Sequence, residues 1–235
     1  GYIICVMIID KIFLSLNQLL VSEKKIMNTH ITFVLDSSGS MSSIREDTIG
    51  GFNTFLEEQQ EEDGSATVSL IDFNTTVEIT YRGMAIEGAE KLTAETYTTG
   101  GKTALFDAIV TAIDDTTAFL SGIDAADRPD NVIVVVLTDG KENASETPQE
   151  TVREHIETKQ DDHDWEFLFI GANQDAALTA EGVGIDRQNS LNMDHSGEGT
   201  RSAYKSTSER ISEYRQTGET DGYTEEDRRR QDESS

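Results

Sequence analysis

Two apolar runs constrain the fold of this chain more than any other feature. Residues 132–137 form a continuous run of branched apolar side chains, and residues 31–35 form a shorter run that contains β-branched members. Apolar runs of this length without polar alternation are typical of strands that are buried on both faces, as in the middle of a parallel sheet. We therefore expect a sheet enclosed between two layers of helix.

Helical patterns alternate with these strands. Apolar residues recur at helical spacing over residues 44–56 and again over residues 105–119. Between them, residues 66–73 and 77–82 are typical of two strands joined by a short turn, which predicts an antiparallel hairpin. Later segments continue the pattern as a strand, a short helix, a weak edge strand and a polar last helix, over residues 165–170, 175–181, 190–193 and 200–214.

This alternation predicts an α/β fold. The expected architecture is a doubly wound, mainly parallel central sheet with one antiparallel edge hairpin strand and helices on both faces. At 235 residues the chain fits one domain, which we assign to residues 28–216.

The two ends of the chain differ from this domain. Residues 1–27 are rich in Ile and Leu and begin with Gly, whereas Met27 resembles a natural start, so we interpret the segment as a non-native extension, either spurious translation or an added helix. Asp10 and Lys11 interrupt its apolar stretch, and no membrane span is expected. Residues 217–235 are charged and contain few apolar side chains, which predicts a disordered tail.

The net charge of the chain limits which classes of partner it can bind. It carries 45 acidic and 19 basic residues, a formal net charge of −26. A surface of this kind cannot release counterions from phosphates, which argues against nucleic acid as a partner. Self-repulsion of this size is tolerable when salt screens it, so we predict a salt-adapted protein from a halophile. Cys5 is the only cysteine, so no intrachain disulfide forms and cysteine pairing does not indicate the compartment. A cytoplasmic location is compatible with this and is our prediction.

Oxygen-bearing side chains follow both apolar runs. Asp36 ends the first run and is followed by Ser38 and Ser40, and Asp139 follows the second run. Ligands of open α/β sheets bind outside the carboxyl ends of strands, at the point where the winding direction reverses. If the two strands are neighbours, the two carboxylates converge, and Thr103 in a nearby loop can add a hydroxyl. Hard divalent cations prefer oxygen ligands of these kinds.

The order of these residues resembles the metal-ion-dependent adhesion site (MIDAS) of von Willebrand factor type A (vWA) domains. That site consists of Asp-x-Ser-x-Ser after a buried strand, then a Thr, then an Asp followed by Gly, and the resemblance covers about residues 30–215. It implies a stand-alone domain with the Rossmann-like vWA fold and a complete site. The implied metal residues are Asp36, Ser38, Ser40, Thr103 and Asp139.

The resemblance also implies a function. Ser38, Ser40 and Thr103 would coordinate Mg²⁺ directly, with Mn²⁺ or Ca²⁺ also compatible, whereas Asp36 and Asp139 would act directly or through water. A Glu or Asp of a partner protein would then fill the exchangeable position on the cation, and the chain itself would not be an enzyme. The sequence leaves the identity of the partner and the oligomeric state open.

A Mg²⁺-dependent enzyme is the alternative. Gly101-Lys102-Thr103 precedes a helix as the end of a phosphate-binding loop would, but Thr96 occupies the position where that motif needs a glycine. Asp36 could also act as a nucleophile in phosphoryl transfer. Haloacid-dehalogenase-like phosphatases usually have a second Asp at the position of Ser38, which weakens that reading.

The predicted salt adaptation can be tested by circular dichroism. We expect helix and strand signals to strengthen as KCl rises from about 0.1 M to several molar, because the Debye length then falls below ~3 Å and the acidic side chains no longer repel one another. Full secondary structure at the lowest salt concentration would contradict the halophilic origin.

Overall fold

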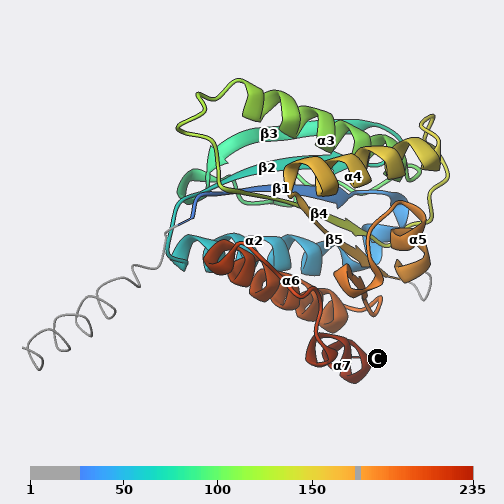
Figure 1. Cartoon of the computed structure of the whole chain (residues 1–235). Coiled ribbons are helices and arrows are strands. Elements are labelled where there is room, and N and C mark those ends of the chain that lie inside the picture. Colours follow the sequence, from blue (N-terminus) through green and yellow to red (C-terminus); the bar gives the residue numbers. More distant parts are fainter. Residues whose placement is uncertain (1–26, 173–175, 235) are drawn as a thin grey trace, which may run out of the picture.

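A six-stranded sheet forms the centre of the computed structural model, which describes residues 27–172 and 176–234 (Figure 1). The strand order is β3-β2-β1-β4-β5-β6. Only β3 runs antiparallel to its neighbour, and the other strand pairs are parallel. The strands are β1 (Thr29–Asp36), β2 (Ala66–Phe73), β3 (Val77–Ala85), β4 (Asn131–Thr138), β5 (Glu166–Gly171) and β6 (Ser190–Asn192).

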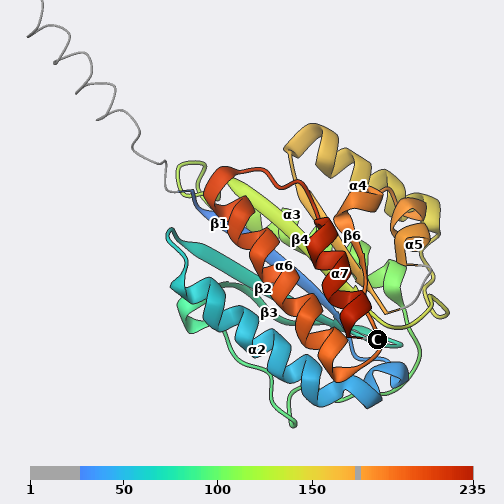
Figure 2. The same ribbon diagram turned by 90° about the horizontal axis from the view of Figure 1, so that it is seen from below.

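Helices cover both faces of the sheet, which confirms the predicted fold class. Figure 1 and Figure 2 show α2 and α6 on one face and α3, α4 and α5 on the other. The α-helices are α2 (Arg45–Glu61), α3 (Leu105–Ser121), α4 (Gln149–His163), α5 (Ala176–Gly182), α6 (Gly197–Thr217) and α7 (Glu225–Glu233). Short 3₁₀ helices are η1 (Gly39–Ile44), η2 (Ile86–Gly88) and η3 (Arg187–Asn189).

Strand β1 lies in the middle of the sheet and contributes to both cores, as its apolar sequence predicts. Phe33 faces the α2 and α6 layer, where its ring packs edge-on against Phe52 at 5.3 Å and stacks on Tyr204 at 5.9 Å between centroids. The adjacent Val34 belongs to the second core with residues of α3 such as Ile109. This alternation is what a strand requires when both of its faces are buried.

The pairing of β1 with β4 defines the functional end of the sheet. The two strands are parallel and aligned so that Leu35 lies opposite Leu137. The chain leaves β1 toward β2 on one side and later returns to β4 on the other side, so the winding direction reverses between these two strands. Their carboxyl ends therefore open into the crevice where ligands of such sheets bind.

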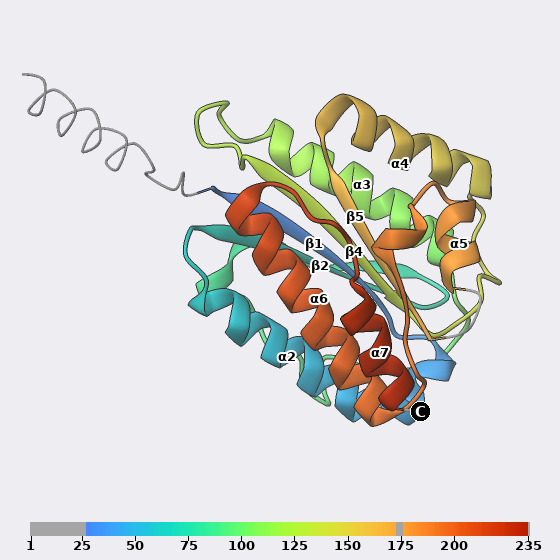
Figure 3. The same ribbon diagram turned by 60° about the horizontal axis from the view of Figure 1, so that its bottom comes forward.

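The carboxyl-terminal segment is folded, and the prediction of a disordered tail over residues 217–235 is wrong for the described residues up to 234. Helix α7 lies beside α6 on the same side of the sheet (Figure 3). It begins with a capping box formed by Thr224 and Asp227. Tyr223, which is 4% exposed, packs into the core and its hydroxyl lies 2.9 Å from Thr207 Oγ1. Polar contacts, rather than apolar area, hold this helix in place.

The amino-terminal prediction lies largely outside the described residues, because residues 1–26 are not among them. Within residues 27–172 and 176–234, no helix has both the length and the apolar character required to cross a membrane.

The buried His30 on β1 provides a test of the packing between β1 and α3. Its Nδ1 lies 2.8 Å from Thr67 Oγ1, its Nε2 lies 3.1 Å from Thr32 Oγ1, and its ring lies 5.0 Å from that of Phe119. Burial lowers the pKa of His30 from 6.5 to about 4, although the charge of Asp115 opposes the shift. Between about pH 4 and pH 6.5, the imidazole therefore stays neutral in the folded protein, whereas it binds a proton in the unfolded chain.

We predict that His30 makes the protein less stable in acid. Its contribution to stability is complete above pH 6.5 and is lost as the pH falls toward 4, because the unfolded chain then binds a proton that the folded protein does not. Urea unfolding at constant KCl should show that wild type loses roughly 2–3 kcal/mol more than His30→Gln between pH 7.5 and pH 4.5. Equal losses in the two proteins would show that burial does not hold this side chain neutral.

Candidate metal centre

The first loop of the site begins where β1 ends. Asp36 is fully buried, and both of its carboxylate oxygens accept hydrogen bonds. The backbone N–H of Ser38 donates to Oδ1 at 2.6 Å, and the hydroxyl of Thr138 donates to Oδ2 at 2.6 Å. The hydroxyl of Tyr97 donates to the backbone carbonyl of Asp36. These contacts fix the position of the carboxylate at the end of the sheet.

Two serine hydroxyls follow on the same loop. Ser38 precedes η1, and the tight 3₁₀ turn brings its hydroxyl to 3.0 Å from that of Ser40. Ser40 also donates a hydrogen bond to Oδ1 of Asp139. The loops that follow β1 and β4 are therefore joined directly by side chains.

The loop that carries Thr103 is the second loop of the site, and the loop after β4 is the third. The backbone of the second loop contacts both of the others. Gly100 N donates to Ser37 O at 2.8 Å, and Thr103 N donates to Asn143 Oδ1 at 3.0 Å. Gly101 has a φ of +77°, a backbone conformation that favours glycine. These contacts bring the loop that carries Thr103 to the carboxyl ends of β1 and β4.

Gly140 marks the point where the three loops meet. A Cβ atom at this position would lie 2.4 Å from Thr103 Oγ1 and 3.3 Å from Asp36 Oδ2. The absence of a side chain thus allows the Thr103 hydroxyl to approach the third loop closely. The structure consequently brings together all five residues singled out in the sequence, which are Asp36, Ser38, Ser40, Thr103 and Asp139.

Burial disfavours the charged form of both carboxylates of the site. Burial raises the pKa of Asp36, and the charge of Asp139 acts in the same direction, whereas hydrogen bonds from Thr138 and Ser38 oppose the shift. Burial also raises the pKa of Asp139, against the opposing effects of Ser40 and His195. Oδ2 of Asp139 is buried, and within the described residues no well-aligned hydrogen bond reaches it, although Nε2 of His195 lies 2.8 Å away. A bound cation would compensate these buried charges, so the residues fit a metal ion.

The chemistry of the donors limits which metals fit. Within the described part of the chain, no group of three or more His, Cys, Asp and Glu side chains could hold a metal ion. A metal at the end of β1 and β4 therefore has to rest on hydroxyl oxygens as well as on the two carboxylates. An all-oxygen donor set of this kind suits a hard cation such as Mg²⁺ better than a soft one.

Several supporting residues could not be recognised from the sequence motif. Thr138 directly precedes Asp139, and its hydroxyl becomes a partner of Asp36 only because β1 and β4 are in register. Asp72 of β2 accepts a hydrogen bond from the Ser37 hydroxyl, and burial raises the pKa of Asp72 to about 6. His195 lies in the loop after β6, and its Nε2 is 2.8 Å from Asp139 Oδ2. No local sequence signal points to that contact.

Comparison with known proteins agrees with this architecture. The family model for the von Willebrand factor type A domain matches residues 30–212, and the chain belongs to this family. A comparison with curated protein sequences finds no significant match.

Solved structures with the same fold include two kinds of protein. Proximal thread matrix protein 1 from the mussel byssus is 17% identical with a TM-score of 0.55, and the match covers 76% of this chain and 46% of that one. The pilus adhesin SpaC from Lactobacillus rhamnosus GG, in its open conformation, is 13% identical with a TM-score of 0.57, and the match covers 80% of this chain and 30% of that one. This chain thus spans less than half of each of those proteins.

Loss of a single oxygen donor should weaken cation binding without unfolding the domain. We predict that Asp36→Ala and Thr103→Ala each lower Mg²⁺ affinity by roughly tenfold or more, measured by isothermal titration, with an unchanged circular dichroism spectrum. Thr99→Ala is the matched control, because its hydroxyl is in the same loop as Thr103 but contacts Ser42 at 2.9 Å. Unchanged affinity in both site variants would refute the assignment.

Proposed function

We propose that this chain is a divalent-cation-dependent protein-interaction module. In this proposal Ser38, Ser40 and Thr103 bind Mg²⁺ through their hydroxyls, and Asp36 and Asp139 hold it directly or through water. A Glu or Asp carboxylate of a partner protein completes the coordination. The observation that carries the proposal is the convergence of these oxygen donors from three loops around Gly140.

The arrangement of charges supports capture of an acidic group. Both carboxylate oxygens of Asp36 already accept hydrogen bonds from the protein, which favours a role for this residue through water. The remaining direct donors are then mainly neutral hydroxyls, so the cation keeps much of its positive charge and prefers an anionic ligand. Mn²⁺ and Ca²⁺ have the same preference for oxygen, and they remain compatible with the site.

Comparison with the mussel protein supports a divalent cation at this place. Proximal thread matrix protein 1 has also been solved with a zinc-occupied MIDAS motif. That structure is 16% identical with a TM-score of 0.55, and the match covers 76% of this chain and 46% of that one. The metal in that protein lies in the motif that the five residues here resemble. The preference for Mg²⁺ in this chain rests on its own hydroxyl-rich donor set.

The rim of the site also favours an acidic partner. Lys102 and Lys141 are exposed and directly follow Gly101 and Gly140 in the second and third loops. They are two of only 19 basic residues in a chain with a net charge of −26. Positive charge at this point would draw an acidic segment of a partner toward the metal and away from the acidic remainder of the surface.

A catalytic role is disfavoured by the environment of Asp36. A nucleophile needs a free oxygen that can reach the substrate, whereas the Asp36 carboxylate is fully buried and both of its oxygens are hydrogen-bonded. We therefore propose binding without catalysis. A cytoplasmic location stays a prediction from the sequence.

Capture from a native high-salt lysate tests the proposed function. Wild-type protein with Mg²⁺ should retain a partner that is released by EDTA and is not retained by Thr103→Ala, because the partner's carboxylate binds the cation. Thr99→Ala should retain it as wild type does. Each acidic residue of the partner can then be replaced singly by its amide. One of these replacements should abolish retention.

Two outcomes would contradict the proposal. One is a partner that is retained equally in Mg²⁺ and in EDTA, since the metal would then play no part in the interface. The other is Mg²⁺-dependent phosphatase turnover that disappears in Asp36→Asn, which would favour the enzyme alternative.

A further inference from the structure

A fourth loop reaches the candidate metal centre. Residues 193–196 connect β6 to α6, and His195 in this loop contacts the third loop through Asp139. The imidazole Nε2 lies 2.8 Å from Asp139 Oδ2 and 3.4 Å from the hydroxyl of Ser43, which belongs to η1. His195 thus bridges the segments that carry Ser40 and Asp139, although it is not part of the five-residue pattern.

Both oxygens of Asp139 are contacted from opposite loops. Ser40 donates a hydrogen bond to Oδ1, and His195 Nε2 faces Oδ2. The Asp139 side chain is 1% exposed, whereas that of His195 is 42% exposed. Contacts at both oxygens fix the plane of a carboxylate, and the orientation of such a group determines how well it serves a metal.

Helix α7 holds the fourth loop in place through Gln231, which is 4% exposed. The backbone N–H of Asp194 donates to Gln231 Oε1 at 2.9 Å, and Gln231 Nε2 donates to the carbonyl of Gly199 at 3.2 Å. A single amide group therefore joins the two sides of the loop that presents His195. The hydroxyl of Ser196 adds a contact of 3.4 Å to the carbonyl of Ser234.

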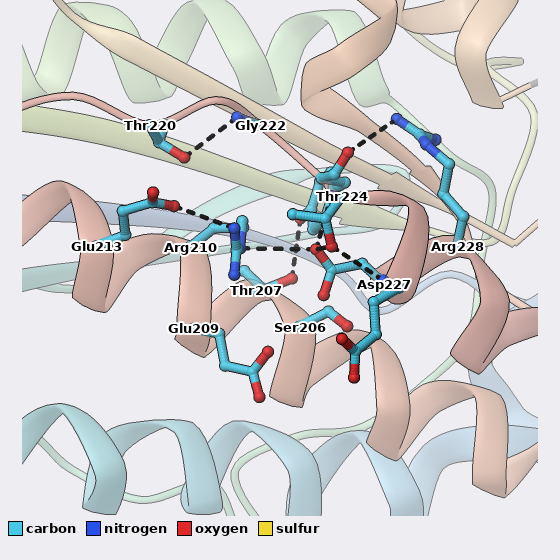
Figure 4. A network of polar contacts seen from close by, with 12 residues as sticks. Ser206, Thr207, Glu209, Arg210, Glu213, Thr220, Gly222, Thr224, Asp227 and Arg228 are labelled. Carbon is cyan, nitrogen blue, oxygen red and sulfur yellow. Dashed lines mark hydrogen bonds and ion pairs between the residues drawn. The ribbon is translucent and has the colours of Figure 1, made fainter.

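The helix has its own anchors, so its position does not depend on the metal site. Figure 4 shows Thr224 and Asp227 at the start of α7, with Arg210 of α6 directed toward Asp227 at 3.6 Å. Arg228 donates to the carbonyl of Ser190 in β6 at 2.9 Å. Helix α7 also lies beyond residue 212, where the match to the family model ends.

We propose that His195 is a positioning residue that holds Asp139 for the metal, and that α7 keeps His195 in place through Gln231. This inference rests on the proposed function, because it assigns these residues to the same site. If His195 and Gln231 act in this way, helix α7, which lies outside the region matched by the family model, contributes to the strength of metal binding. His195 acts through Asp139 and is not itself a ligand.

Mn²⁺ binding followed by electron paramagnetic resonance tests the inference on the full chain. We expect His195→Ala to weaken Mn²⁺ binding about tenfold, as loss of an outer partner of a ligand does, and His195→Gln to restore part of the affinity because its amide keeps a polar N–H group beside Asp139. Gln231→Ala should weaken binding by a smaller factor, roughly threefold, because the loop persists but is less restrained. Arg229→Ala is the matched control on α7, because Arg229 is 67% exposed and pairs with Glu233.

The combined variant distinguishes positioning from a general loss of structure. If Gln231 acts through His195, the double variant His195→Ala/Gln231→Ala should bind Mn²⁺ no more weakly than His195→Ala alone. Fully additive losses would overturn the link from α7 to His195. Unchanged binding in His195→Ala, while wild type binds Mn²⁺, would overturn the positioning role and leave the proposed function intact. Absence of Mn²⁺ binding by wild type would overturn both.

Discussion

The parallel pairing of β1 with β4 is the interaction on which the rest of the structure depends. Backbone hydrogen bonds align the two strands from Thr29 opposite Asn131 to Leu35 opposite Leu137. Because both strands are buried on both faces, a shift of one residue would place every side chain on the wrong face. The same register places Thr138 against Asp36 and directs Asp139 into the crevice. The register that aligns the sheet therefore also positions the two carboxylates of the site.

Burial of charge is the cost that accompanies this arrangement. The pKa values of both Asp36 and Asp139 are raised by burial, and a chain with a net charge of −26 offers little compensation from its surroundings. Neutral hydroxyls share the crevice with these carboxylates, so a cation bound there would not be neutralised completely. Such a cation would favour an acidic ligand.

Much of the fold could be predicted because its strands depend on apolar runs that are visible in the sequence. Residues 132–137 alone indicate a central parallel strand, and β4 extends over Asn131–Thr138. The five candidate metal residues could be singled out because their order along the chain resembles a known pattern, and the fold brings them together. Their role in metal binding stays a prediction.

The missed features depend on polar contacts between segments that are distant in the sequence. Helix α7 contains no apolar side chain, and its position rests on buried polar residues such as Asp227 and Gln231, which composition cannot distinguish from solvated ones. His195 has no local signal either. Its approach to Asp139 depends on the short strand β6 and on α7, which together determine where the 193–196 loop lies.

Anomalous diffraction from crystals soaked in Mn²⁺ would locate the metal. We expect one anomalous peak at the carboxyl end of β1 and β4, coordinated by the hydroxyls of Ser38, Ser40 and Thr103, with Asp36 and Asp139 beside it. In crystals of Thr103→Ala the peak should be weaker or absent. Full occupancy of Mn²⁺ elsewhere on the acidic surface, with no peak among these five residues, would show that they do not form a metal centre.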